Sequence, residues 1–187
     1  HRMISDQFFM SNEKHFDVIF IDGLHEYPQD RKDAFHALSF LEDSGWTAFH
    51  DFLPSNWKEQ HVPRISNAWT GDCWKFALEL MQGTGIEFKI IEVDCGDGLF
   101  RQTCSSWNIP NLSNELATAN FGTFVKAKER LPIISFYHFA DRVLKPILYC
   151  VLISAYVSYL PSAIIIIYPL QISGPPNNFG SVVPTLE

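Results

Sequence analysis

The chain has 187 residues, of which 47% are hydrophobic and 14% aromatic, and its formal net charge at pH 7 is −7. This length corresponds to one domain, or to one domain with a tail, and the apolar content is sufficient for a sizeable buried core. A nucleic-acid-binding surface is excluded, because phosphate binding needs clustered Lys and Arg residues and the sequence has no such cluster.

The first third of the chain predicts a strand–helix–strand unit. Residues 5–10 have the pattern of a short capped helix. The apolar run from Phe16 to Ile21 is rich in β-branched residues and predicts a strand buried on both faces of a parallel sheet. Apolar residues then recur at helical spacing from Ala34 to Leu41. We expect Ser44-Gly45 to end this helix and Trp46 to Phe49 to form a second strand, parallel to the first.

The segments that follow are expected to complete a half-sheet with flanking helices. The polar stretch at residues 56–68 predicts a loop of the kind that carries function. An amphipathic helix is expected over residues 73–82 and a strand over residues 88–93. After a turn at Gly96-Asp97-Gly98, a further strand is expected to return antiparallel over residues 99–103. The rest is expected to be a loop at 105–115 and a weak helix at 121–141, interrupted at Pro132.

The four cysteines give no sign of a metal site or a disulfide framework. They form no CxxC pair and have no spacing typical of zinc ligands. We therefore expect reduced, mostly buried thiols, which favours a cytoplasmic location. The first residues contain no apolar signal-peptide core. The cysteines are Cys73, Cys95, Cys104 and Cys150.

Polar side chains follow both strands of the predicted unit. Asp22 follows the first strand, and His50 and Asp51 follow the second. Because parallel neighbours lie ~4.8 Å apart and end at one edge, these residues are expected to converge in the ligand-binding crevice of the sheet. Two carboxylates suit Mg²⁺, and an added imidazole favours Mn²⁺, Fe²⁺ or Zn²⁺. His25, three residues after Asp22, is then free to act as a general base near neutral pH.

Structural interpretations of the same residues are also open. Asp22 can cap the next helix, and His50 can be a half-buried residue at a strand end, bonded to a backbone carbonyl. Their shared position at one sheet edge favours a functional site. The segment from Asp94 to Asp97 is interpreted as a turn. The remaining histidines are expected at the surface or in loops, namely His15, His36, His61 and His138.

Three stretches carry a resemblance to a known family: FDVIFIDGLHEY at residues 16–27, FHDF at 49–52 and WTGDCWKFALEL at 69–80. Together they resemble class I S-adenosylmethionine-dependent methyltransferases, most strongly methyltransferase-domain proteins with an IDGLHxY signature. The resemblance covers about Ser5 to Gln102. It implies an α/β fold with a partial Rossmann-like sheet of the fourth to seventh strands, flanking helices and an apolar C-terminal tail. The strands at residues 16–21 and 46–49 would be the fourth and fifth, and the segments at Phe88 and Leu99 would be the closing antiparallel pair.

The resemblance also implies a site. Metal-dependent O-methyltransferases place one ligand after the fourth strand and two adjacent ligands after the fifth, and Asp22, His50 and Asp51 occupy the equivalent spacing. The base of the catechol type stands where this sequence has His25. The implied function is methyl transfer to a hydroxyl of a small molecule or sugar, with S-adenosylmethionine and Mg²⁺ or another divalent metal as cofactors. Asp22 and Gly23 would face the methyl donor. His50 replaces an acid, so a different metal, or none, is expected.

The cofactor half of the family pattern does not occur in this sequence. The glycine-rich turn after the first strand is missing, as is the ribose-binding acid after the second; Gly83-Thr84-Gly85 and Gly96-Asp97-Gly98 lie elsewhere. We therefore expect residues 1–145 to be the C-terminal half of a methyltransferase domain, which on its own is a weak or inactive catalyst.

Residues 146–187 are expected to be a separate apolar tail. The 26 residues from Ile147 to Ile172 carry no charge, and ~20 suffice for a membrane-spanning helix. Ile164 to Ile167 favour a strand instead. A transmembrane or interfacial segment, a non-native extension and a packed apolar terminal element remain as alternatives, the first of which implies membrane association.

Two other functions stay open at this point. One is a metal-dependent hydrolase-type site with His25, His50 and Asp51 as ligands. The other is a non-catalytic, degenerate interaction domain. Under the methyltransferase interpretation the partner is a small-molecule acceptor.

Overall fold

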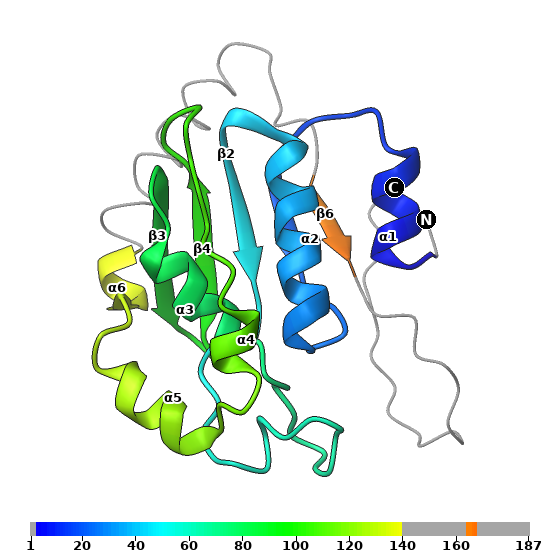
Figure 1. Ribbon diagram of the computed structural model, residues 1–187. Coiled ribbons are helices and arrows are strands. Elements are labelled where there is room, and N and C mark those ends of the chain that lie inside the picture. The colour runs from blue at the N-terminus through cyan, green and yellow to red at the C-terminus, as the bar shows by residue number, and fades with distance from the viewer. Residues whose placement is uncertain (1–2, 140–163, 168–187) are drawn as a thin grey trace.

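The computed structural model describes residues 3–139 and 164–167. This part forms a six-stranded sheet in the order β5-β3-β4-β2-β1-β6, with helices packed against it (Figure 1). The strands are β1 Phe16–Ile21, β2 Leu41–Phe49, β3 Ile86–Glu92, β4 Asp97–Gln102, β5 Ile133–Ser135 and β6 Ile164–Ile167. The helices are α1 Ser5–Ser11, α2 Tyr27–Ser39, α3 Trp74–Gln82, α4 Ser113–Leu116, α5 Phe121–Lys128 and α6 Phe136–Phe139.

The predicted strand–helix–strand unit is the centre of this sheet. β1 and β2 pair in parallel, with Val18 opposite Trp46 and Ile21 opposite Phe49, and α2 connects them. β4 runs antiparallel to both β2 and β3, so β3 is parallel to β2. The predicted fold class is confirmed: the sheet is mixed α/β and compatible with a partial Rossmann-like methyltransferase fold. As a consequence, β1, β2 and β3 end at one common edge.

The prediction that Ser44-Gly45 ends the helix is wrong. α2 ends at Ser39, where the Phe40 amide bonds back to the Ala37 carbonyl, and β2 already begins at Leu41. The pairing with β1 shifts register between Phe16 and Val18, which accommodates the extra residues of β2. A Cβ on Gly45 would lie only 3.0 Å from the Phe16 carbonyl oxygen, so glycine here allows close strand approach rather than breaking the strand.

The expected weak helix over residues 121–141 is divided into three elements. α5 begins with a capping box between Asn120 and Thr123 and ends at Lys128, before Pro132. β5 then pairs in parallel with β3, with Ile90 opposite Ile133, and α6 follows it. Pro132 therefore precedes a strand at the sheet edge, and the helical pattern of the surrounding residues did not predict that strand.

An aromatic core lies directly under the end of β2. The ring centroid of Phe49 is 5.7 Å from that of Phe52, 5.8 Å from that of Phe76 and 5.9 Å from that of Phe100. All four rings are buried. α2 and α3 pack over the same face of the sheet, as Figure 1 shows. The backbone that carries His50 and Asp51 is therefore anchored on both sides by buried aromatic residues.

A buried polar network connects α2 to α3. The Glu79 side chain has no solvent exposure, and its Oε1 accepts hydrogen bonds from the Tyr27 hydroxyl at 2.5 Å and the Leu112 amide at 2.7 Å. Its Oε2 accepts a hydrogen bond from Nε of Arg31 at 2.9 Å. Each oxygen of this buried carboxylate is thus satisfied, as a buried charge requires.

Of the expected tail at 146–187, only Ile164–Ile167 lies within the described residues. It forms β6, which pairs in parallel with β1, as its β-branched residues favour. No helix in the described part of the chain is long and apolar enough to cross a membrane. The rest of the segment considered as a membrane span, 147–163 and 168–172, lies outside the described residues.

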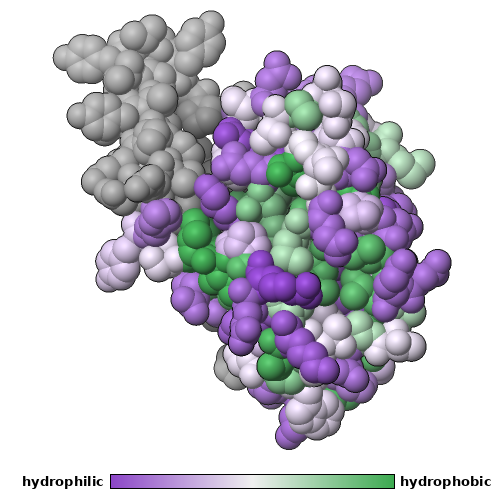
Figure 2. Space-filling model, turned by 60° about the vertical axis from the view of Figure 1, so that its left-hand side comes forward, coloured by the Kyte–Doolittle hydropathy of each residue, from purple (hydrophilic) through white to green (hydrophobic). Residues whose placement is uncertain are grey.

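The surface and the thiols differ in part from expectation. The described part of the face in Figure 2 is a mosaic of hydrophilic and hydrophobic residues, as is usual for a folded domain. The three described cysteines are free, but only Cys73 is buried, whereas Cys95 is half-buried and Cys104 exposed. The expectation of mostly buried thiols is therefore wrong for two of these three.

Candidate functional site

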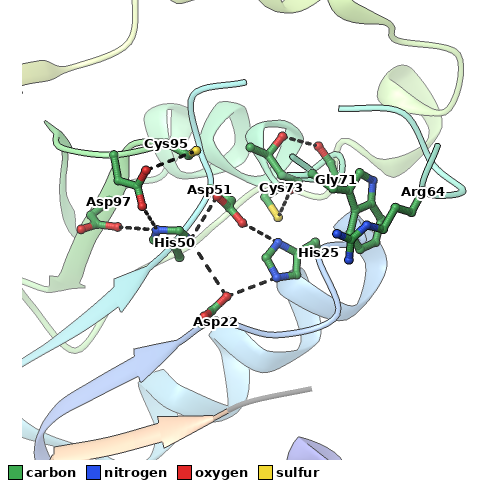
Figure 3. Close-up of polar contacts among 12 residues, drawn as sticks. Asp22, His25, His50, Asp51, Arg64, Gly71, Cys73, Cys95 and Asp97 are labelled. Atoms are coloured by element: carbon green, nitrogen blue, oxygen red, sulfur yellow. Dashed lines mark hydrogen bonds and ion pairs between the residues drawn. The ribbon is translucent and has the colours of Figure 1, made fainter. Parts of the chain in front are cut away.

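The sheet brings the predicted ligand residues together. Asp22 follows β1, and His50 and Asp51 follow β2, so their side chains meet at the common strand edge (Figure 3). One ligand atom from each of these three side chains lies within 4.8 Å of the other two. Asp51 is almost fully buried, while Asp22 and His50 are half-buried. The cluster is thus open to solvent on the Asp22 side and closed behind Asp51.

His25 lies between the two carboxylates. Its Nε2 is 3.2 Å from Oδ1 of Asp22, and its Nδ1 is 2.5 Å from Oδ2 of Asp51. The contact at Nδ1 does not meet hydrogen-bond geometry, so it is an ionic contact away from the N–H direction. The imidazole therefore bridges the ends of both strands.

His50 contacts carboxylates with both ring nitrogens. Nδ1 is 3.1 Å from Oδ1 of Asp51 and 4.0 Å from Oδ1 of Asp22. Nε2 faces the other way, 3.4 Å from Oδ2 of Asp94 and 3.8 Å from Oδ1 of Asp97. These contacts distinguish His50 from a strand-end residue held by a backbone carbonyl.

Asp22 does not cap the helix that follows it. The N-cap residue of α2 is Glu26, and its side chain makes no capping hydrogen bond. The Tyr27 amide instead donates to Oδ1 of Asp72 at 2.8 Å, from the segment before α3. The capping interpretation of Asp22 is therefore wrong, and its carboxylate is left for the site.

The backbone at this edge adopts unusual conformations. Three non-glycine residues in the described part of the chain have positive φ: His25 at 58°, Asp51 at 69° and Asp94 at 47°. Asp51 belongs to the cluster, and His25 and Asp94 contact it through Asp51 and His50. Left-handed φ in non-glycine residues costs on the order of 1 kcal/mol or more and gathers at functional sites.

A second segment fixes His25 in place. Gly71 has a φ of 57°, and a Cβ there would lie 1.6 Å from the His25 carbonyl oxygen, so only glycine fits. The Trp69 ring lies 5.4 Å from the His25 ring at 30°, and the Arg64 guanidinium lies 5.6 Å from the Trp69 ring. The loop predicted to carry function therefore leads into a segment that covers His25.

The electrostatics of the cluster favour charged imidazoles. Burial lowers the pKa of His25, but the Asp22 and Asp51 carboxylates outweigh it and raise that pKa to about 10. The contact with the Asp51 carboxylate raises the pKa of His50 to about 9 against the effect of burial. Burial would raise the pKa of Asp51, yet both imidazoles hold it below its usual value. In the ligand-free chain at neutral pH, His25 and His50 are therefore protonated.

The donor set fits a divalent cation. Carboxylate oxygens from Asp22 and Asp51 with a nitrogen from His50 suit Mn²⁺, Fe²⁺ or Zn²⁺ better than Mg²⁺.

Gly23, expected to face a methyl donor, lies beside Asp22. A Cβ on Gly23 would come no closer than 3.5 Å, to Oδ2 of Asp33, so packing does not require glycine there.

The described residues contain a second group with metal-ligand atoms, Asp6, Asp33 and His36. Its acids are already paired, because Lys32 Nζ lies 2.5 Å from Oδ2 of Asp6 and Gln29 donates to Oδ1 of Asp33 at 3.0 Å. A cation would have to displace these partners, so this group is a structural contact between α1 and α2.

Asp94 and Asp97 were not identified as site residues from the sequence. The segment from Asp94 to Asp97 had been interpreted only as a turn. The strand order indicates that this turn lies at the site. Because β3 is parallel to β2, the turn after β3 lies at the same sheet edge as His50.

Comparison with known proteins gave one match. The model of a family described as methyltransferase domain matches residues 1–52. This segment contains Asp22, His25, His50 and Asp51, and over it the resemblance to a methyltransferase-domain protein is confirmed. Searches of curated proteins and of solved structures each found no match.

Proposed function

We propose, from the methyltransferase-domain match, that this sheet edge is the acceptor side of an S-adenosylmethionine-dependent methyltransferase acting on a hydroxyl of a small molecule or sugar. Methyl transfer as the general activity rests on the match over residues 1–52. The acceptor site rests on one observation, the convergence of Asp22, His50 and Asp51 within 4.8 Å at the ends of adjacent parallel strands. S-adenosylmethionine, when bound, would supply the activated methyl group.

Asp22, His50 and Asp51 would hold a divalent cation in this proposal. The ion would supply Lewis acidity that lowers the pKa of an acceptor hydroxyl. Asp51 would bind from the buried side, and Asp22, whose side chain is 29% exposed, would bind from the side open to solvent. An acceptor would therefore approach past Asp22.

His25 would remove the proton of the acceptor hydroxyl. In the ligand-free chain its raised pKa keeps it protonated, because it is itself the positive charge between Asp22 and Asp51. His25 becomes a proton acceptor only when another positive charge offsets those two carboxylates. Its ring would be held in position by Trp69, whose ring lies 5.4 Å away in a tilted arrangement.

The hydrolase-type alternative is less well supported. It needs a ring nitrogen of His25 as a ligand, yet the nitrogens of His25 face two different carboxylates, and the metal-capable group does not include His25. A degenerate interaction domain leaves unexplained why His25, Asp51 and Asp94 all keep left-handed φ at one edge.

Calorimetric titration of the 187-residue chain with Mn²⁺ tests the proposal. We expect one saturable site, at least tenfold weaker in Asp51→Asn, and retained in Glu87→Gln, which removes an acid from β3 away from the cluster. A folded chain that binds no Mn²⁺, Zn²⁺ or Mg²⁺ would refute the metal site. Zn²⁺-dependent ester hydrolysis by this chain would favour the hydrolase instead.

A further inference from the structure

Two acids outside the proposed ligand set lie against the far nitrogen of His50. Nε2 is 3.4 Å from Oδ2 of Asp94 and 3.8 Å from Oδ1 of Asp97, while Nδ1 faces Asp51 and Asp22. Figure 3 shows the ring lying between Asp97 on one side and Asp22 and Asp51 on the other. The two ring nitrogens therefore have separate environments, one toward the proposed ion and one away from it.

The turn that carries these acids is fixed to the segment after β2. The Phe52 amide donates to the Gly96 carbonyl at 2.9 Å, and the Leu53 amide donates to the Cys95 carbonyl at 2.6 Å. Gly96 has a φ of 87°, and a Cβ there would lie 2.4 Å from Cγ of Leu53. Only glycine allows this close approach, so the position of the acids beside His50 is set by the backbone.

Asp97 is the stronger candidate of the two. The Asp94 side chain is 70% exposed, whereas that of Asp97 is 28% exposed. Oδ1 of Asp97 is buried and makes no hydrogen bond. A buried carboxylate oxygen without a donor is costly, and the Nε2–H group of His50 faces it. The two atoms are 3.8 Å apart, beyond hydrogen-bond distance, so the proposed bond requires one of the side chains to rotate.

We propose that Asp97, with Asp94 beside it, is a positioning residue that accepts the Nε2–H proton of His50 and directs the Nδ1 lone pair toward Asp22 and Asp51. This inference rests on the proposed metal site. Carboxylates that orient a ligating histidine in this way fix its tautomer, and their removal typically lowers metal affinity about ten- to hundredfold.

Three variants of the full chain test this role by Zn²⁺ titration. Asp97→Ala removes the acceptor, and we expect an affinity loss of about ten- to hundredfold. Asp97→Asn keeps a neutral acceptor oxygen and should recover part of that loss. Asp43→Ala removes an exposed acid at the opposite end of β2 and should bind Zn²⁺ like the wild type. Thermal unfolding without metal identifies a variant that has failed to fold.

Nitrogen NMR of the His50 ring gives a readout that a merely structural role would not change. In the Zn²⁺ complex we expect the metal on Nδ1 and the proton on Nε2. Equal Zn²⁺ affinity in all variants, or a metal on Nε2, would overturn the positioning role and leave the metal site intact.

A folded wild type that binds no Zn²⁺, Mn²⁺ or Mg²⁺ would overturn the metal site of the proposed function instead, and the positioning role, which rests on that site, would fail with it.

Discussion

Asp51 and Glu79 are both carboxylates with almost no access to solvent, yet their surroundings are different. Glu79 faces one guanidinium, that of Arg31, and accepts two further hydrogen bonds from neutral donors. Asp51 has a left-handed φ, and its carboxylate contacts the imidazoles of His25 and His50. The Asp22 carboxylate contacts the same two imidazoles.

This comparison distinguishes Glu79, whose charge has a fixed structural partner, from Asp51, whose partners can lose their protons and be replaced by a cation. The partner of Glu79 is an arginine, which does not lose its proton in proteins, so the network connecting α2 to α3 keeps one state. The partners of Asp51 are histidines, whose protons leave when the local charge changes. A cation can therefore replace the imidazolium charge at Asp51, and nothing equivalent is available at Glu79.

The largest expected effect is at Glu79. Glu79→Ala leaves Arg31 without its buried partner and the Tyr27 hydroxyl without an acceptor, so we expect the free energy of unfolding to fall by about 3–5 kcal/mol. Urea denaturation measures this. Glu87→Ala is the control, since its contacts with Arg101 and Lys89 are half-exposed and worth about 0–1 kcal/mol. Equal losses of unfolding free energy in Glu79→Ala and Glu87→Ala would show that the buried Glu79 network is no more stabilising than a surface ion pair.

Binding of a divalent metal at the Asp51 cluster should stabilise the folded chain, and this stabilisation should not require Glu79. At an Mn²⁺ concentration of 100 times its Kd, binding to the folded chain should add about 2.7 kcal/mol of stability and raise Tm. Asp51→Asn should lose this gain, because it removes the buried ligand. Glu87→Gln should keep it. The same Tm rise in Asp51→Asn would show that the ion binds elsewhere.

Alkaline pH should weaken the cluster in the metal-free chain. The pKa values of His25 and His50 are raised by folding, so their stabilisation is complete below about 6.5 and is lost as pH rises through about 9 to 10. The pKa of Asp51 is lowered, so its contribution is lost as pH falls below its usual value. For His50 alone the alkaline loss is on the order of 2 kcal/mol, after a reduction for partial exposure.

The pH dependence is tested by comparing the free energy of unfolding of the wild type with that of His50→Gln. The stability gap between wild type and His50→Gln, measured by urea denaturation with a chelator, should narrow as pH rises from neutral to about 10. A gap that stays constant over this range would mean that His50 is not charged in the folded chain.

The convergence of Asp22, His50 and Asp51 could be predicted from sequence because it depends only on local signals. Two buried apolar runs joined by a helix must be parallel neighbours, and the residues after them then share an edge. The same pattern predicts an α/β fold, whereas the partial Rossmann-like sheet was predicted from the resemblance to methyltransferases.

The errors arose where long-range pairing decides the outcome. Gly45 has the local pattern of a breaker, but it lies inside β2 because the Phe16 carbonyl approaches it closely. Asp97 reaches the site only through the β3–β4 turn, whose position depends on contacts such as that of Gly96 with Leu53. No short sequence pattern contains that information.

The smallest expected effect is at Trp69, and it sharpens the same comparison within the site. Trp69 covers the His25 ring, whereas Trp74 is fully buried against Phe124. Trp69→Ala should lower the free energy of unfolding by only about 1 kcal/mol, the scale of one aromatic pair, while shifting the ring resonances of His25 in NMR spectra. Trp57→Ala, at a side chain 52% exposed, should change neither quantity. A loss as large as that expected for a core residue, about 3–5 kcal/mol, would place Trp69 with Glu79 among the structural contacts, and the segment over His25 would no longer count as part of the site.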